Sequence, residues 1–235
     1  MQNIFEKKVS DYIKKNKKFF ITIILYFLYQ YQFTFEIIKM FFSNFNNLPY
    51  LIKIILLILA DLIYVIILIF MYKKEIKNAI LDLKNNFLDR SFIAVKYWAF
   101  GCIIMFISSI IIAYLTKNNL SGNEKLVRQY LKQMPIQMIF SCCFMAPILE
   151  EATFRISLKG LIKNKWIFII TSGLLFGLLH VSPPYTLANL SYIIPYGAMG
   201  ISFAYLLYKT DNIMLPIIIH FIHNTILILK QLIGG

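Results

Sequence analysis

Residues 50–72 read YLIKIILLILADLIYVIILIFMY, an apolar run with Asp61 near its middle. An α-helix rises about 1.5 Å per residue, and about 20 apolar residues are needed to cross the hydrocarbon core of a bilayer. The run therefore predicts a membrane-spanning helix. Because a charged group at membrane depth is costly, Asp61 is expected either to take part in the activity or to find a polar partner inside a helical bundle.

The composition of the whole chain agrees with this interpretation. Of its 235 residues, 59% are hydrophobic and 15% are charged, whereas soluble domains have about 45–50% apolar and about 25% charged residues. A soluble globular protein is thereby excluded. The apolar runs predict an all-α, polytopic transmembrane helix bundle of about seven spans, at residues 19–42, 50–72, 92–116, 135–158, 166–181, 190–208 and 213–230.

The net charge of +13 could suggest a nucleic-acid partner, but its distribution argues against one. Fifteen of the 24 lysines and arginines fall on one side of the predicted spans, against five on the other. The fifteen lie in residues 1–18, 73–91 and 159–165 and at Lys209. Cytoplasmic flanks are enriched in Lys and Arg, so the N-terminus is predicted to be cytoplasmic. Anionic lipids are the expected partners of these flanks, and no nucleic acid is expected.

Two basic segments, residues 1–18 and 73–91, are predicted to lie on the membrane surface as amphipathic helices. The first apolar run lacks a small-residue cleavage site, so it is expected to remain as a signal anchor. Three cysteines fall inside predicted spans without metal-type spacing, and we interpret them as packing residues: Cys102, Cys142 and Cys143.

The composition changes in kind after the polar stretch 117–133 and Pro135, because polar and ionisable residues now occur at helical spacing within apolar runs. We therefore divide the chain into residues 1–134, a basic segment with three transmembrane helices, and residues 135–235, a four-helix catalytic core. The two halves share no internal repeat, which disfavours many transporter folds.

The first motif, APILEEATFR at 146–155, places two adjacent carboxylates inside a predicted span. Glu151 and Arg155 are i and i+4 with the acid first, which favours an ion pair. Successive helical residues point about 100° apart, so this pair does not satisfy Glu150. One glutamate is thus predicted to be structural and the other free to act as a general base on water. Pro147 is expected to loosen the helix; the alternative is a purely structural charge cluster.

The second motif is FGLLH at 176–180. Phe176 lies one turn before His180 on the same helical face, where its ring would shield the imidazole from lipid. Gly173 and Gly177 are also one turn apart and are expected to allow two helices to approach closely.

The third motif lies in IIIHFIHNTILIL at 217–229, where His220 and Asn224 are i and i+4. Imidazole and carboxamide groups can donate hydrogen bonds to a developing oxyanion. Two alternatives remain for these side chains: a hydrogen-bonded seam between helices, or a divalent metal held by two histidines and a glutamate. On three separate spans, the motifs together supply the groups needed to hydrolyse an amide inside a membrane.

In order and spacing, Glu150-Glu151-x-x-x-Arg155, Phe176-x-x-x-His180 and His220-x-x-x-Asn224 resemble the motifs of the CPBP family. This family, also called Abi, contains intramembrane proteases, including the CAAX prenyl endopeptidases. The resemblance covers about residues 150–224 and extends loosely over 135–235. It implies a catalytic set of Glu150, His180, His220 and Asn224, and a supporting set of Glu151, Arg155 and Phe176. His223 matches no catalytic position of the family.

The resemblance implies an endopeptidase that cleaves a membrane-inserted or lipid-anchored peptide, using water activated by glutamate and histidine. A divalent metal such as zinc would be held by Glu150, His180 and His220, or no cofactor would be used. The Ile, Lys and Asn bias of the chain favours an AT-rich bacterial genome and a multi-pass protein of the bacterial cytoplasmic membrane. The implied roles are processing of signalling or bacteriocin peptides, self-immunity, or regulation of envelope proteins.

Two other classes of function remain open at this stage. One is a non-catalytic membrane protein that confers immunity or binds a regulator by contact, and the other is a proton-coupled transporter. The hydrolase hypothesis also carries a geometric difficulty. The helical rise places Glu150 and His220 about 13 and 12 Å from the cytoplasmic ends of their spans, but His180 about 22 Å. The three converge only if the helix at 166–181 is tilted, starts late or breaks.

Overall fold

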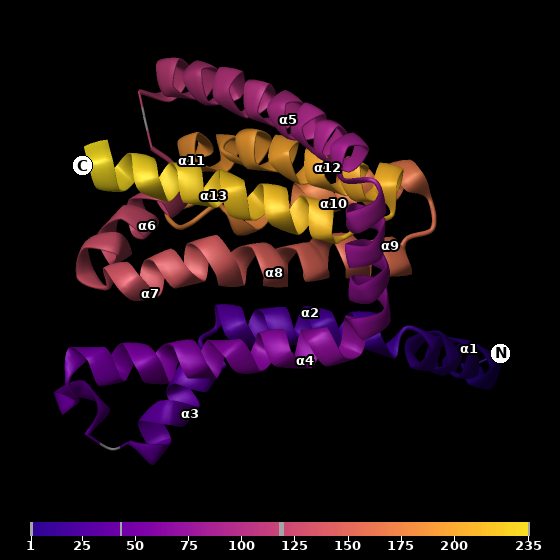
Figure 1. Cartoon of the computed structure of the whole chain (residues 1–235), viewed down its shortest axis with the longest axis horizontal. Coiled ribbons are helices and arrows are strands. Elements are labelled where there is room, and N and C mark those ends of the chain that lie inside the picture. The colour runs from indigo at the N-terminus through magenta and orange to yellow at the C-terminus, as the bar shows by residue number, and fades with distance from the viewer. Residues whose placement is uncertain (1, 43, 118–119, 235) are drawn as a thin grey trace.

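The structure is a computed structural model that describes residues 2–42, 44–117 and 120–234 (Figure 1). The described residues form helices joined by short loops, with no strand among them, as the all-α prediction requires. The α-helices are α1 (Gln2–Lys15), α2 (Lys17–Gln30), α3 (Phe33–Phe41), α4 (Tyr50–Asn85), α5 (Phe87–Thr116), α6 (Gly122–Gln133), α7 (Pro135–Phe140), α8 (Ala146–Glu151), α9 (Leu158–Leu161), α10 (Lys165–Leu179), α11 (Leu187–Ser191), α12 (Ile193–Thr210) and α13 (Met214–Gly234). A 3₁₀ turn, η1 (Phe45–Asn47), precedes α4, and two π-helical turns, η2 (Ser141–Met145) and η3 (Ala152–Ser157), flank α8.

Within the described residues, five stretches are helical and apolar enough to cross a membrane: α4, α5, the continuous stack Pro135–Leu161, the stretch Leu187–Thr210, and α13. The pair α2 and α3 would add a sixth span if the bend of 59° between them lies within one crossing. The remaining predicted span, at 166–181, corresponds to α10, which has 15 residues. At about 1.5 Å per residue, α10 is shorter than a hydrocarbon core of about 30 Å.

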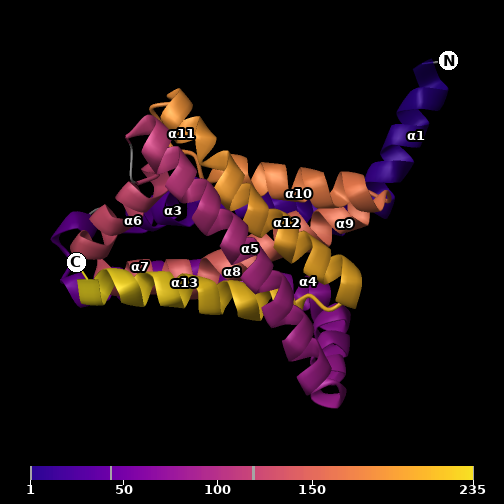
Figure 2. The same ribbon diagram turned by 90° about the horizontal axis from the view of Figure 1, so that it is seen from above.

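The basic segment 73–91 is helical up to Asn85, and a kink at Tyr72 separates it from the first part of α4, as expected for a distinct helix (Figure 1). α4 continues to Asn85 through one residue with non-helical dihedral angles, Tyr72, and α5 begins at Phe87. Neither Pro nor Gly occurs between 73 and 85 to end the helix. At the kink, the hydroxyl of the buried Tyr72 lies 2.8 Å from the Thr22 hydroxyl of α2. The predicted helix at the N-terminus is present as α1, which projects away from the bundle (Figure 2).

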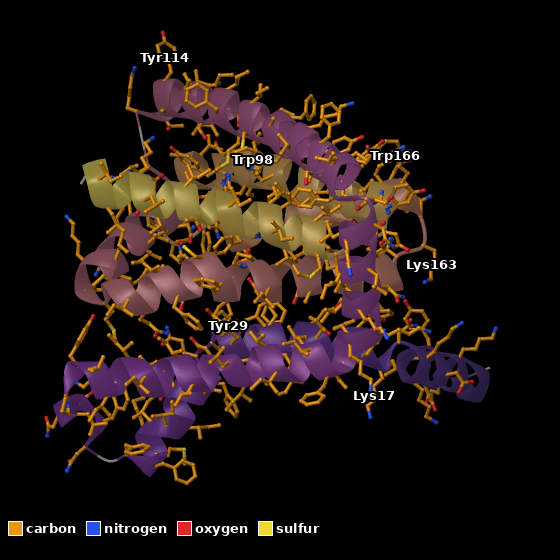
Figure 3. All side chains as sticks on the ribbon, in the orientation of Figure 1. Lys17, Tyr29, Trp98, Tyr114, Lys163 and Trp166 are labelled. Atoms are coloured by element: carbon orange, nitrogen blue, oxygen red, sulfur yellow. The ribbon has the colours of Figure 1, made fainter. Side chains whose placement is uncertain are left out.

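The bundle has two ends of different character. The N-terminus, the α4–α5 turn, the α9–α10 loop and the α12–α13 loop lie at one end, which we call the basic end (Figures 1 and 2). The end of α5, α6, α11 and the C-terminus lie at the other, which we call the α6 end. Lys17 and Lys163 mark the basic end and Tyr114 the α6 end in Figure 3.

Close packing of α10 on α12 depends on glycine. A Cβ built on Gly173 would lie 2.3 Å from Ile201 Cγ1, and one built on Gly177 would lie 2.6 Å from the carbonyl oxygen of Ile193. Both distances are well below van der Waals contact, so the backbones meet only because these side chains are absent. The predicted close approach of helices at these glycines is therefore present.

The two halves of the chain pack together. Tyr26 of α2 meets Phe154 of η3 edge to face, with ring centroids 5.3 Å apart. The Gln137 amide of α7 donates to Asp61 of α4 at 3.1 Å. Asp61 therefore has a polar partner inside the bundle, which was one of the two predictions for this residue. These contacts place the N-terminal helices against α7 and η3, on either side of the helix α8 that carries the glutamates.

Candidate active site

The two glutamates are presented by α8, between the π-helical turns η2 and η3. In η2 the Ala146 N–H bonds to the Ser141 carbonyl, five residues back. In this register the next carbonyl, that of Cys142, would require an N–H from residue 147, and proline has none. Pro147 therefore leaves the Cys142 carbonyl without a backbone partner, which is the loosening of the helix that the sequence predicted.

Glu151 and Arg155 form the ion pair expected from their spacing. Arg155 Nε lies 2.9 Å from Glu151 Oε2, and both side chains are fully buried. The guanidinium also donates to the Ser172 hydroxyl of α10 at 3.0 Å, and it stacks 4.7 Å above the Phe176 ring. Isolated buried charges are costly, so this cluster of partners is what allows Arg155 to lie inside the bundle.

His220 joins this cluster through an interaction that the sequence did not reveal. Its Nδ1 lies 2.9 Å from Glu151 Oε1. A carboxylate only accepts hydrogen bonds, so Nδ1 carries the proton and the ring is held with Nε2 directed elsewhere. Nε2 lies 3.9 Å from Oε2 of the neighbouring glutamate, Glu150. Such a carboxylate–histidine pair fixes both the tautomer and the orientation of an imidazole.

Glu150 lacks the partners that its neighbour has. Its side chain is buried, and Oε2 makes no hydrogen bond within the described part of the chain. The side chain lines a cavity of about 520 Å³, which we call the Glu150 cavity. Other residues of its wall include Phe176, His180, Tyr196, Phe203, His220 and Asn224. The three motifs thus meet around one space.

His180 lines the cavity from the C-terminal end of α10. The helix begins at Lys165 and stops at Leu179, so His180, its C-cap residue, lies one helix length of about 22 Å from the start of α10. Nδ1 lies 2.8 Å from the Phe176 carbonyl, which can only accept, and this leaves Nε2 without the proton when the ring is neutral. The ring is sandwiched between Phe176 at 4.5 Å and Tyr196 at 4.6 Å.

Asn224 supplies a hydrogen-bond donor to the carbonyl that Pro147 leaves without a backbone N–H. Its side-chain amide donates to the Cys142 carbonyl at 2.8 Å. An amide nitrogen carries two hydrogens, so one N–H remains for another acceptor at the cavity wall. The residue is therefore both a link between α13 and η2 and a donor at the site.

His223 faces another helix. The indole N–H of Trp98 donates to its Nδ1 at 3.3 Å, and Cys102 Sγ lies 3.9 Å from the same atom. Both partners belong to α5 (Trp98 is labelled in Figure 3). His223 also borders the cavity, but its Nδ1 is engaged by α5.

The donor set does not fit the divalent metal that the resemblance allowed. Among the residues that the structure describes, no three His, Cys, Asp or Glu side chains are grouped so that they could hold a metal ion. Glu150 and His220 approach each other to 3.9 Å, but a catalytic zinc site uses three protein ligands. No step is therefore assigned to a metal.

Two tyrosines at the site escaped sequence reasoning. Tyr196 of α12 stacks on His180, and its hydroxyl lies 2.9 Å from that of Ser121, the N-cap residue of α6. Tyr29 of α2 also lines the cavity (labelled in Figure 3). They are two of 15 tyrosines, and neither lies in a motif. Only the long-range packing of α2 and α12 brings them to the site.

Comparison with known proteins bears on the same region. The family model described as type II CAAX prenyl endopeptidase Rce1-like matches residues 132–226, which contain all three motifs. Over these residues the chain is similar to this family of membrane endopeptidases.

A Bacillus subtilis (strain 168) protein named "Putative membrane peptidase YdiL" is 32% identical to the chain over 115 residues. The match covers 48% of this chain and 44% of that relative, so the chain spans less than half the length of the relative. No solved structure gives a significant match. The similarity to the family model is therefore confined to the second half of the chain, where the glutamates and histidines lie.

Proposed function

We propose that this protein is a membrane-embedded endopeptidase that hydrolyses a peptide bond of a membrane-inserted or lipid-anchored substrate. One observation carries the proposal: a buried Glu150 oxygen without a hydrogen-bond partner in the described chain borders a cavity, 3.9 Å from His220 Nε2. A carboxylate in this position suits a general base. The similarity of residues 132–226 to CAAX prenyl endopeptidases and the name of the Bacillus relative support the same class of activity.

In the proposed reaction, water in the cavity gives one proton to Glu150 while its oxygen bonds to the carbonyl carbon of the scissile peptide. The free N–H of Asn224, and Nε2 of His220 or His180 when protonated, are positioned to donate hydrogen bonds to the developing oxyanion. The C–N bond then breaks, and the proton held at the site passes to the leaving amine. The products are a carboxylate and an amine.

Glu151, Arg155 and Phe176 support this chemistry without taking part in it. The Glu151 carboxylate fixes His220, Arg155 neutralises Glu151, and Phe176 packs against both Arg155 and His180. The host membrane we propose is the bacterial cytoplasmic membrane. There the enzyme would process signalling or bacteriocin peptides, provide self-immunity or regulate envelope proteins.

The test is a comparison of membrane peptides from cells that express the wild type, Glu150→Gln or Glu36→Gln. Glutamine is nearly isosteric with glutamate but cannot take a proton from water, so product peptides should disappear in Glu150→Gln and persist in Glu36→Gln. Glu36 pairs with Lys39 on α3, and it is absent from the cavity wall. Any substrate found is then assayed with purified protein in lipid. Undiminished cleavage by Glu150→Gln would refute the proposed base, and a cellular effect that persists in this variant would favour protection by contact.

A further inference from the structure

The Glu150 cavity is sealed toward the basic end of the bundle. On each of three segments, the next residues toward that end include a completely buried side chain. These side chains are Arg155 of η3, beyond Glu150; Ser172 of α10, one turn from Phe176; and Ala204 of α12, next to Phe203. Phe168, one turn further along α10, is 1% exposed. This layer of buried side chains separates the cavity from the basic end and leaves no path there for water or a peptide.

The cavity opens toward the α6 end. There its wall is formed by α6 and the last turns of α13, where Arg128, Leu227 and Lys230 are exposed. His220 and Lys230 are ten residues apart on one helix, which corresponds to about 15 Å. An extended peptide of about five residues spans this distance.

The basic charge identifies the two sides of the membrane. Fifteen lysines and arginines belong to the segments at the basic end, where Lys17 and Lys163 are labelled in Figure 3. Because α3 and the start of α4 lie at the α6 end (Figure 1), Lys39 and Lys53 join the five assigned there, which makes seven. The excess still marks the basic end as cytoplasmic.

We propose that the Glu150 cavity is reached from the extracytoplasmic side, between α6 and the C-terminal turns of α13. Substrates would then be peptides whose scissile bond is presented at the outer leaflet, such as segments that emerge from the membrane there or lipoprotein chains anchored in it. Cytoplasmic tails would be excluded. The substrate class rests on the proposed hydrolysis, but the side of access rests only on the sealed layer, the open wall and the charge.

Cysteine accessibility tests the side of access without any substrate. In a background in which Cys102, Cys142 and Cys143 are replaced by alanine, Ala146→Cys places a thiol in the cavity wall. Leu227→Cys is a second probe nearer the opening, and Lys163→Cys marks the basic end. Right-side-out and inverted membrane vesicles are treated with a charged, membrane-impermeant methanethiosulfonate.

Ala146→Cys and Leu227→Cys should react in right-side-out vesicles and lose this reaction in inverted ones, whereas Lys163→Cys should show the reverse. Reaction of Ala146→Cys on the same side as Lys163→Cys would overturn the proposal. So would a cavity thiol that reacts only after solubilisation in detergent. If Ala146→Cys is not produced in folded form, Leu227→Cys decides in the same way. Labelling does not require catalysis, so an inactive enzyme that labels as expected would contradict the hydrolysis alone.

Discussion

Glu150 and Glu151 are neighbours on α8, yet their carboxylates lie in regions of opposite character. The Glu151 region is dry, because the carboxylate is fully buried, pairs with Arg155 and accepts from His220. The Glu150 region is a cavity wall, where Oε2 has His220 Nε2 at 3.9 Å and no hydrogen bond within the described residues. Adjacent residues on a helix are separated by about 100°, and this rotation is enough to change the surroundings entirely.

The difference separates a group that holds the fold from a group that is free to react. A buried carboxylate that is paired with a cation and accepts from a donor has little tendency to take up a proton, because both neighbours favour its charged form. A buried carboxylate beside an open volume can interact with water, and it can change its protonation state without breaking protein contacts. His220 connects the two regions, since one ring nitrogen faces each glutamate.

The largest contrast is expected between Glu150→Gln and Glu151→Gln. Glu150→Gln should lower the rate of hydrolysis by about 10²–10⁴-fold, the typical contribution of general acid–base catalysis, with the melting temperature in detergent unchanged or raised. Glu151→Gln should lower the melting temperature, because Arg155 loses its counter-charge. Parallel assays of activity and thermal unfolding measure both. If the two variants behave alike, the separation into a reactive and a structural region is wrong.

Arg155→Ala should be the most destabilising single change in the dry region. It leaves Glu151 buried without its cation, and breaking a buried pair costs about 3–5 kcal/mol. Low yield or a lowered melting temperature is the expected result. Arg128→Ala is the matched control, because Arg128 pairs with Glu124 on an exposed face and such pairs contribute about 0–1 kcal/mol. An Arg155→Ala protein as stable as Arg128→Ala would contradict the assigned role.

The two histidines of α13 should differ in their effect on activity, because His220 contacts both glutamates and His223 contacts α5. His220→Ala should reduce activity by about 10²–10³-fold, comparable to deletion of one oxyanion donor, because this ring connects Glu151 with the cavity. His223→Ala should cost much less and act through packing, since its partners Trp98 and Cys102 belong to α5. Kinetics and elemental analysis of both purified variants provide the measurement. A dead His223→Ala protein would show that the active face of α13 is rotated, and loss of a stoichiometric metal with it would restore the metal hypothesis.

Sequence patterns predicted the local part of this arrangement well. Apolar runs located the helices, and the i, i+4 spacing predicted the Glu151–Arg155 pair and a Glu150 outside it. Contacts between residues far apart in the sequence had no such local pattern. His220 and Glu151 are 69 residues apart, and Tyr196 contacts His180 only because α12 packs against α10. Hydropathy also predicted a seventh span at 166–181, because it measures apolar character and not where the chain turns. Despite the predicted difference in depth, His180 lines the same cavity as Glu150 and His220.

Asn224→Ala should have an intermediate effect on stability. It leaves the Cys142 carbonyl without its donor, and an unsatisfied buried group costs about 1–3 kcal/mol. A double-mutant cycle with Pro147→Ala tests the cause, because alanine restores a backbone N–H at the position where η2 lacks one. The cost of Asn224→Ala should shrink in the Pro147→Ala background. Strictly additive effects would indicate that Pro147 does not create the demand that Asn224 meets.

The smallest effect is expected at Asp61, which tests whether the reactive region extends beyond the cavity. Asp61 is half-buried, accepts from the Gln137 amide at 3.1 Å and is absent from the cavity wall. Asparagine keeps an oxygen that can accept this bond, so Asp61→Asn should change the stability by less than about 1 kcal/mol and leave hydrolysis at the wild-type rate. Asp61→Leu, which removes the acceptor, should destabilise more than Asp61→Asn and still cleave. Loss of activity in a stably folded Asp61→Asn protein would mean that a carboxylate on α4 belongs to the catalytic machinery. Glu150 would then not be the only reactive carboxylate among the buried polar groups.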